Sequence, residues 1–138
     1  MLNHTTVDGK PLLDLVKDKR LSKESLESIV QRTKTGGAEI VKLLEKGSAF
    51  YAPAASGVEM AESYLKNLKK QLPCAVYLNG EYDVYELYAG VPVIIGAKGV
   101  EKIIELDLSS QEKKDFDNSI VAVQDLFSAA KKIDTNLK

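Results

Sequence analysis

A ten-residue stretch of small and aromatic side chains, residues 47–56, constrains the fold more than any other part of the sequence. It reads Gly-Ser-Ala-Phe-Tyr-Ala-Pro-Ala-Ala-Ser and separates two segments with helical periodicity. Gly47 can adopt the positive φ that ends one helix, Ser48 can accept hydrogen bonds from the amides of the next, and Pro53 limits where regular hydrogen bonding begins. We therefore predict a sharp helix-to-helix corner, which is either an ordinary packing junction or the wall of a site.

Helical periodicity extends on both sides of this corner. Ser22 is the predicted N-cap of a helix that ends near residue 46, with one face formed by Leu26, Val30, Thr33, Gly37, Ile40 and Leu44. A second helix is predicted over 54–70, with a stripe formed by Ala54, Val58, Ala61, Leu65 and Leu68. The pair Gly36-Gly37 either breaks the first helix into two or lets another backbone pack closely against Gly37.

The rest of the chain alternates strand and turn signals before a last helix. The Asp8-Gly9 turn predicts a small hairpin over 4–12. About three antiparallel strands are expected from strand patterns at 74–78, 82–88, 91–95 and 100–108. Pro92 lacks an amide proton, which implies an edge or bulge position. Ser109 and Glu112 form a capping box for a final helix that should cover one face of the sheet.

The predicted fold class is therefore α+β. It combines an antiparallel sheet of about three strands and an N-terminal hairpin with three to four long helices. At 138 residues the chain suits one domain, spanning 1–138, that can bury a core without a disulfide or a metal.

Composition argues against several classes of function. The chain has 19 basic and 20 acidic residues, interspersed, so it lacks an electrostatic footprint for nucleic acid or an anionic membrane. No apolar stretch approaches the roughly 20 residues of a membrane span, and the first residues lack a signal-peptide pattern. The lone Cys74 lies in an apolar run, and we interpret it as a small buried hydrophobe rather than a nucleophile. We expect a cytoplasmic protein.

Recognisable catalytic motifs are absent from the sequence. It has no Gly-rich phosphate loop, no Cys/His metal spacing and no G-x-S-x-G elbow. The only histidine, His4, is placed on a predicted edge strand and interpreted as a solvated surface residue rather than a general base. Glu39 with Glu45, or Asp83 with Glu86, could form carboxylate pairs, but solvated charges explain them better.

Seven blocks, in the same order, closely resemble the carboxyl-terminal half of bacterial NAD-dependent malate dehydrogenases of the lactate-dehydrogenase-like type. The resemblance covers nearly the whole chain, and the blocks are residues 29–33, 36–41, 47–56, 60–66, 72–75, 77–82 and 88–93. Seven ordered blocks are far more specific than one motif. The sequence departs from the family pattern at Asp83, Gly57 and Lys98, and these departures are expected to change local turn shape only.

The resemblance implies the substrate domain of an enzyme that interconverts (S)-malate and oxaloacetate by hydride transfer with NAD, a step of the tricarboxylic acid cycle. In that family an N-terminal Rossmann domain carries the dinucleotide fingerprint. The proton-transfer histidine, in a Gly-His-Gly-Asp segment, and the substrate-binding arginines also lie upstream of the matched part. His4 is followed by Thr5-Thr6 and does not match that segment. We therefore expect no catalytic residue, no metal ligand, no activity and no tight NAD binding in this chain alone.

What the resemblance carries over is one wall of the site. By alignment of 47–56, Ala49 would face the dicarboxylate pocket and Pro53 would lie near the nicotinamide ring. Lactate-specific relatives carry threonine at the position of Ala49, and alanine leaves more room for a four-carbon substrate. In the family both long helices contact the Rossmann domain and a neighbouring subunit, so a homo-oligomer is expected. The alternative is a free-standing, non-catalytic binding or assembly module derived from this domain.

Overall fold

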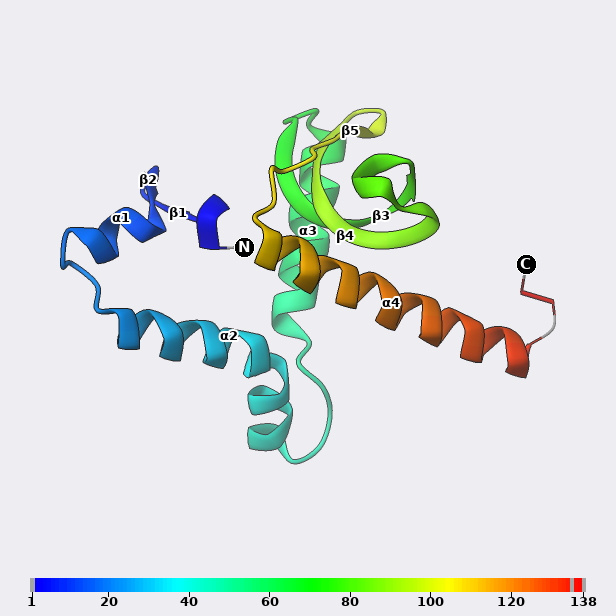
Figure 1. The fold of residues 1–138 in the computed structure, drawn as a ribbon. Helices are drawn as coiled ribbons and strands as arrows, with labels where there is room; N and C mark the ends of the chain where they lie inside the picture. The colour runs from blue at the N-terminus through cyan, green and yellow to red at the C-terminus, as the bar shows by residue number, and fades with distance from the viewer. Residues whose placement is uncertain (1, 135, 138) are drawn as a thin grey trace. The chain divides into compact units, whose positions relative to one another are not determined.

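The computed structural model describes residues 2–134, 136 and 137, and these form two compact units, Met1–Gly57 and Val58–Lys138 (Figure 1). In chain order the elements are η1 Leu2–His4, β1 Thr6–Val7, β2 Lys10–Pro11, α1 Leu12–Lys17, α2 Lys23–Leu44, α3 Tyr51–Leu65, β3 Lys70–Asn79, η2 Glu81–Asp83, β4 Tyr85–Gly96, β5 Gly99–Ile103 and α4 Ser110–Ile133. None of the helices in the described residues has the length and apolar character of a membrane span.

The α+β prediction is confirmed. Within the described residues, β3, β4 and β5 form an antiparallel sheet in that order, and β1 pairs with β2 in a separate hairpin. The hairpin turn has positive φ at both central residues, 49° at Asp8 and 76° at Gly9, as a two-residue turn of this kind requires. Each of its strands is only two residues long, and His4 belongs to the 3₁₀ turn η1 rather than to an edge strand.

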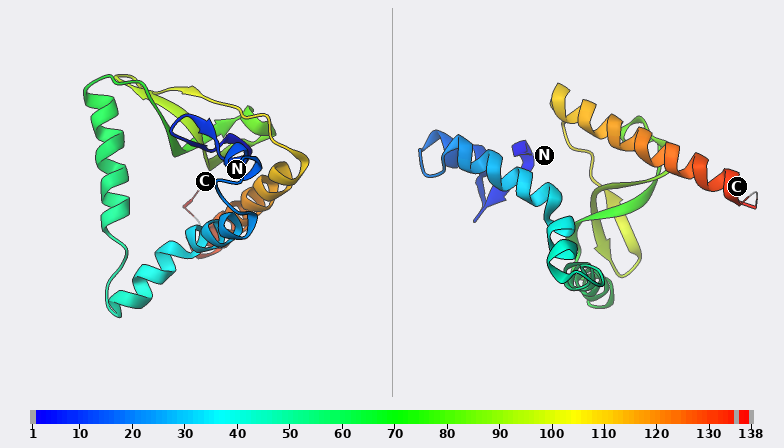
Figure 2. Two further views of the ribbon diagram at one scale, coloured as in Figure 1. Left: turned by 90° about the vertical axis from the view of Figure 1, so that its left-hand side faces the viewer. Right: turned by 90° about the horizontal axis from the view of Figure 1, so that it is seen from below.

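Helix α2 begins as predicted, because the Ser22 hydroxyl accepts a hydrogen bond from the Ser25 amide (3.1 Å). It continues without interruption to Leu44, so a break into two helices at the glycine pair is wrong. Figures 1 and 2 nevertheless show that α2 changes direction in its C-terminal half. A Cβ added at Gly36 or Gly37 would meet nothing within 4 Å, so no backbone among the described residues packs closely there. The local effect of the two glycines is therefore a more flexible backbone in the middle of α2.

The second unit has a continuous core built on β4. Burial alternates along this strand, so that every second side chain from Leu87 to Ile95 is buried and Val93 is fully inaccessible. Helix α4 begins with the predicted capping box of Ser109 and Glu112 and contributes Phe116 and Ile120 to the same core, so it covers the sheet as predicted. The period-2 pattern of the strand thus corresponds to burial residue by residue.

The boundary between α3 and β3 lies earlier in the chain than the sequence pattern predicts. The helix spans Tyr51–Leu65 rather than 54–70, and β3 begins at Lys70 and continues through Pro73. The fully buried Ser63 explains the early end, because its hydroxyl donates to the Ile95 carbonyl (2.7 Å) and accepts from the Lys70 amide (3.2 Å). These bonds tie the strand backbone to the last turn of the helix, so residues 66–70 cannot extend it.

The edge or bulge position expected for Pro92 is wrong, because Pro92 lies within the central strand β4, directly opposite Pro73. Its carbonyl accepts the Ile104 amide (2.8 Å), and an ordinary antiparallel pair would return a bond from residue 92 to the Ile104 carbonyl. Proline has no proton for that bond. The Tyr82 hydroxyl supplies it instead, donating to the Ile104 carbonyl (2.6 Å) and accepting from the Leu106 amide (3.0 Å). A side chain from the β3–β4 turn therefore completes the ladder where proline interrupts it.

Candidate functional site

The corner at 47–56 is formed by an abrupt end of α2. Glu45 follows the helix with a φ of 58°, and Gly47 has a φ of 103°, which confirms the positive φ predicted for this glycine. A Cβ at Gly47 would lie 3.5 Å from the Phe50 ring, an ordinary contact. The backbone conformation, rather than crowding, is therefore what favours glycine here.

The next helix begins differently from the prediction. Helix α3 begins at Tyr51, and the Phe50 carbonyl accepts the Ala54 amide (3.0 Å), so Phe50 occupies the N-cap position. Ser48 lies two residues earlier and caps no α3 amide in the described part of the chain, so its predicted capping role is wrong. Pro53 is the third residue of the helix, where an amide has no intrahelical partner, so the proline does not delay the start.

The two residues predicted to line a site lie on this corner. Ala49 is half-buried in the irregular segment between α2 and α3, and Pro53 is exposed in the first turn of α3. The aromatic residues between them are open to solvent, Phe50 at 64% and Tyr51 at 90% exposure. Residues 47–56 contain no carboxylate, imidazole or thiol. The corner can therefore shape or cover a ligand, but it has no group suited to proton transfer near neutral pH or to metal binding.

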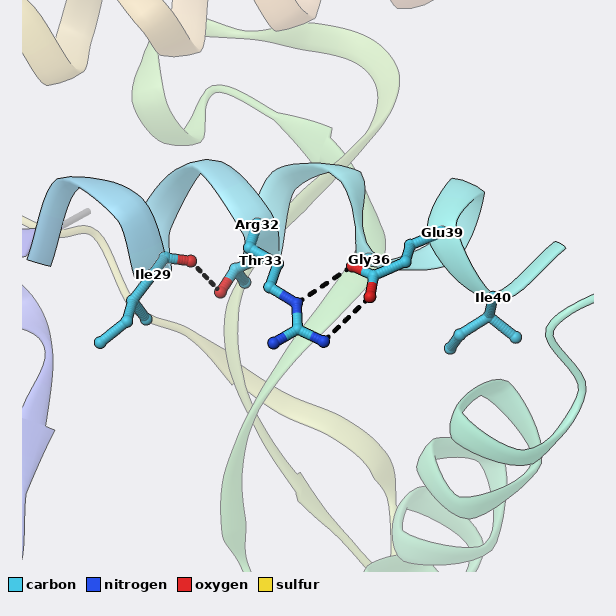
Figure 3. Close-up of a pocket in the computed structure, with 6 residues that line it drawn as sticks. All are labelled: Ile29, Arg32, Thr33, Gly36, Glu39 and Ile40. Atoms are coloured by element: carbon cyan, nitrogen blue, oxygen red, sulfur yellow. Dashed lines mark hydrogen bonds and ion pairs between the residues drawn. The ribbon is translucent and has the colours of Figure 1, made fainter. Parts of the chain in front are cut away.

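An ion pair that the sequence analysis missed spans the glycine pair of α2 (Figure 3). Arg32 donates from Nε to one carboxylate oxygen of Glu39 (3.1 Å) and from Nη2 to the other (2.9 Å). These hydrogen bonds, followed by the guanidinium charge, hold the pKa of the Glu39 carboxyl below its usual value and raise the pKa of Arg32. The seven-residue spacing, two helical turns, was the signal that could have revealed the pair.

Two recesses lie beside α2 in the first unit. One, of about 400 Å³, is lined by Ile29, Arg32, Thr33, Gly36, Glu39 and Ile40 (Figure 3). Its polar groups bond within the helix, since the Thr33 hydroxyl donates to the Ile29 carbonyl (2.8 Å). The other, of about 660 Å³, is mainly apolar and lies between the hairpin, α1 and the first half of α2. Neither recess is lined by Ala49 or Pro53.

The remaining candidate groups lack a catalytic arrangement. Cys74 is half-buried with its sulfur 3.3 Å from that of Met60, and burial raises the pKa of its thiol, which disfavours the nucleophilic thiolate. Glu39 is engaged by Arg32 rather than by a second carboxylate. Across the described residues, no group of three or more His, Cys, Asp or Glu side chains could hold a metal ion.

Comparison with known proteins identifies the relatives of this chain. Residues 1–133 match the family model for the lactate/malate dehydrogenase alpha/beta C-terminal domain. A malate dehydrogenase from Pelagibacter ubique (strain HTCC1062) is 68% identical over 133 residues, which cover 96% of this chain and 42% of the relative.

Two solved structures show the same likeness in three dimensions. The malate dehydrogenase of Cryptosporidium parvum superposes with a TM-score of 0.92 at 42% identity, covering 96% of this chain and 42% of that one. The lactate dehydrogenase of Eimeria maxima, solved with NADH and oxamate, gives 0.93 at 43% identity, covering 98% and 42%. The chain thus spans less than half the length of the relatives that it matches. It belongs to the lactate/malate dehydrogenase family, in which it corresponds to the α/β C-terminal domain.

Proposed function

We propose that this chain is the substrate domain of an NAD-dependent malate dehydrogenase, which interconverts (S)-malate and oxaloacetate. The observation that carries the proposal is the 68% identity to the Pelagibacter ubique malate dehydrogenase across nearly the whole chain. The two solved relatives do not decide between malate and lactate, because one of each kind is about equally similar. Ala49, in the position where lactate-specific relatives carry threonine, adds support for malate.

The proposed enzyme divides its work between two domains. NAD would bind to an N-terminal Rossmann domain, and the proton-transfer histidine and the substrate-binding arginines would come from that part of the protein. NAD supplies the hydride chemistry when it is bound. This domain contributes shape, because Ala49 and Pro53 lie on a corner without acid or base groups. Ala49 would face the dicarboxylate, and Pro53 would exclude water beside the nicotinamide ring.

The size of Ala49 sets its proposed contribution to specificity. One added group in a close-fitting pocket costs about 1–3 kcal/mol of transition-state binding. The second carboxylate of oxaloacetate would be recognised mainly by an arginine outside this chain, through a bidentate pair. Side-chain volume at position 49 is therefore the secondary determinant.

The full-length enzyme carrying Ala49→Thr tests this role. We expect kcat/KM for oxaloacetate to fall about 10-fold, or about 1.4 kcal/mol, with little gain of pyruvate activity because the charge-selecting arginine remains. Ala129→Thr on the exposed surface of α4 is the matched control and should leave the kinetics unchanged. If Ala49→Thr left the oxaloacetate kinetics unaltered, Ala49 would not line the substrate pocket.

The purified 138-residue chain tests the division of labour. We expect no oxaloacetate-dependent loss of NADH absorbance and no tight NAD binding by calorimetry, because the chain has no phosphate loop. Addition of the N-terminal half in trans should restore turnover if this is an enzyme domain. Turnover by the chain alone would refute the proposed division. If the two halves bind each other and are folded but show no activity, the result would favour the alternative that this chain is a non-catalytic module.

Self-association is part of the proposal. Large apolar side chains on the second half of α2 and on the corner are exposed, with Leu43 at 76% and Tyr51 at 90%. Exposed apolar surface of this kind marks an interface more often than an ordinary surface. Sedimentation of the full-length enzyme should give an oligomer, and a monomer at high concentration would contradict this part.

A further inference from the structure

An ion pair joins two residues that lie two turns apart in α2, across the glycine pair Gly36-Gly37. We propose that the Arg32–Glu39 pair fixes the bend of α2 at Gly36-Gly37 and thereby positions the corner at 47–56, so that both are positioning residues for the pocket wall. The first half of this inference stands on the structure of α2 alone. The second half rests on the proposed function of the corner.

The middle of α2 bends easily, but its glycine and threonine residues do not fix the bend angle. Glycines in a helix interior have no side chain to restrict the backbone, and a Cβ at either Gly36 or Gly37 would contact nothing within 4 Å. The Thr35 hydroxyl donates to the Gln31 carbonyl (3.2 Å), as Thr33 does to that of Ile29. Such bonds compete with the helix ladder and favour bending. Neither feature sets the angle.

The ion pair supplies the constraint that these features lack. Residues 32 and 39 lie on one face of the helix, two turns apart, and Gly36 between them presents no side chain in the way (Figure 3). Both guanidinium bonds must be satisfied together, at 3.1 and 2.9 Å, so the fork fixes orientation as well as distance. The side chains are 77% and 40% exposed, so the pair is modest in strength. Over a flexible glycine pair, a modest interaction is enough to select one bend.

The bend matters because the corner continues directly from the C-terminal half of α2. From Gly37 to Leu44 the helix extends about 10 Å, so a rotation of about 10° at the glycines would move its end by about 2 Å. Ala49 lies five residues after that end, in the half-buried segment of the corner. A displacement of about 1 Å in a group that positions a substrate can cost up to about 100-fold in rate. Arg32 and Glu39 would thus influence a substrate that they do not touch.

Spin labels on the two ends of α2 measure the bend directly. Spin labels are attached at Lys23→Cys and Lys42→Cys in a Cys74→Ser background of the 138-residue chain. Pulsed electron paramagnetic resonance then gives the distance between the two ends of α2. Arg32→Gln and Glu39→Gln should each broaden the distance distribution, and the exchanged pair Arg32→Glu/Glu39→Arg should narrow it again. Lys34→Gln removes a cation from the same helix that does not bond to Glu39, and it should change nothing. An unaltered distribution in both single variants would overturn the inference.

The kinetic arm uses the full-length enzyme. We expect Arg32→Gln to lower kcat/KM for oxaloacetate about fivefold, mainly through KM, with KM for NADH unchanged and the exchanged pair restoring most of the loss. Broadened distances with unchanged kinetics would overturn the positioning role of the pair and leave its effect on the bend. If the unmodified enzyme does not turn over oxaloacetate, the proposed function fails, and the distance measurement still decides whether the pair fixes α2.

Discussion

The two units of this chain use apolar residues in opposite ways. In the described part of Val58–Lys138, side chains from β3, β4 and α4, with Val84 just before β4, form a core of nine buried hydrophobic residues. In the described part of Met1–Gly57, Leu26 is the one hydrophobic residue that is buried, although α2 carries a regular apolar stripe. The second unit therefore has a buried apolar core, whereas most of the apolar stripe of α2 in the first unit is exposed.

A regular apolar pattern has different outcomes in the two units. The alternation along β4 coincides with burial at Leu87, Ala89, Val91, Val93 and Ile95. The stripe on α2 is equally regular, yet Ile40 is 43% and Leu44 is 48% exposed. A pattern therefore identifies the face that an element buries, but it does not say which part of the protein supplies the cover.

The largest expected effect comes from matched leucine truncations in the two units. Leu78→Ala removes a fully buried side chain from β3 and should cost about 3 kcal/mol of unfolding free energy, from lost burial and the cavity left behind. Leu43→Ala on α2, where the side chain is 76% exposed, should cost less than about 0.5 kcal/mol. Urea unfolding followed by circular dichroism measures both. Equal losses would show that the leucines of the two units contribute alike to stability.

The next effect concerns Ser63, the only buried polar side chain among the described residues. Ser63→Ala should cost about 2 kcal/mol, because the Ile95 carbonyl loses its partner at a buried position and the Lys70 amide loses its partner at a partly buried one. Ser56→Ala, exposed on the same helix, is the control. Hydrogen exchange should show faster opening at the start of β3 in the first variant alone. A neutral Ser63→Ala would show that the strand does not depend on this tie.

A smaller loss is expected from Tyr82→Phe, about 1.5 kcal/mol at pH 8, since the Ile104 carbonyl and the Leu106 amide lose the shared hydroxyl. Burial raises the pKa of Tyr82. A group with a raised folded-state pKa contributes its full stability below its unfolded pKa, about 10, and loses it as pH rises through the folded value. The difference between wild type and Tyr82→Phe should therefore shrink on titration above pH 10. Tyr85→Phe, 65% exposed, is the control, and a constant difference would contradict this origin.

The smallest effect distinguishes two kinds of glycine. Gly36→Ala should stabilise α2 by about 0.5 kcal/mol, because the position is helical and a Cβ meets nothing within 4 Å. Gly99→Ala also meets nothing, but its φ of 85° disfavours any side chain, so it should destabilise the β4–β5 turn by about 1 kcal/mol. Thermal unfolding of both variants measures the two changes in stability. Stabilisation by both would mean that space, and not backbone conformation, decides.

Local chemistry made much of this fold predictable. The cap at Ser22, the capping box at Ser109, the Asp8-Gly9 turn and the positive φ at Gly47 each depend on one or two residues and their immediate neighbours, and each was confirmed. The family was also predictable, because its blocks are specific in order and content.

Two of the errors, the end of α3 and the place of Pro92, share a cause in long-range bonds. The end of α3 depends on Ser63 meeting Ile95, 32 residues away, and the place of Pro92 depends on Tyr82 reaching Ile104. Neither contact has a signature in a local window of sequence. The Arg32–Glu39 pair was within reach of helical spacing, but a charge on a helix is usually solvated. The roles of Ala49 and Pro53 remain predictions, since shape complementarity to a substrate depends on both sides of a site.

The tyrosine that replaces a missing amide makes two positions of the chain interdependent. Pro92 withholds a hydrogen bond from Ile104, and Tyr82 provides it from the neighbouring turn. The effect of a substitution at position 82 therefore depends on the residue at position 92, a case of epistasis with a single carbonyl oxygen at its centre. With alanine at 92 the backbone could satisfy that oxygen itself, and of the two hydrogen bonds of the tyrosine hydroxyl only the one from the Leu106 amide would still depend on Tyr82. While proline occupies position 92, position 82 must carry a side chain with a hydroxyl that reaches the Ile104 carbonyl. A substitution tolerated at one of these positions therefore depends on the residue at the other.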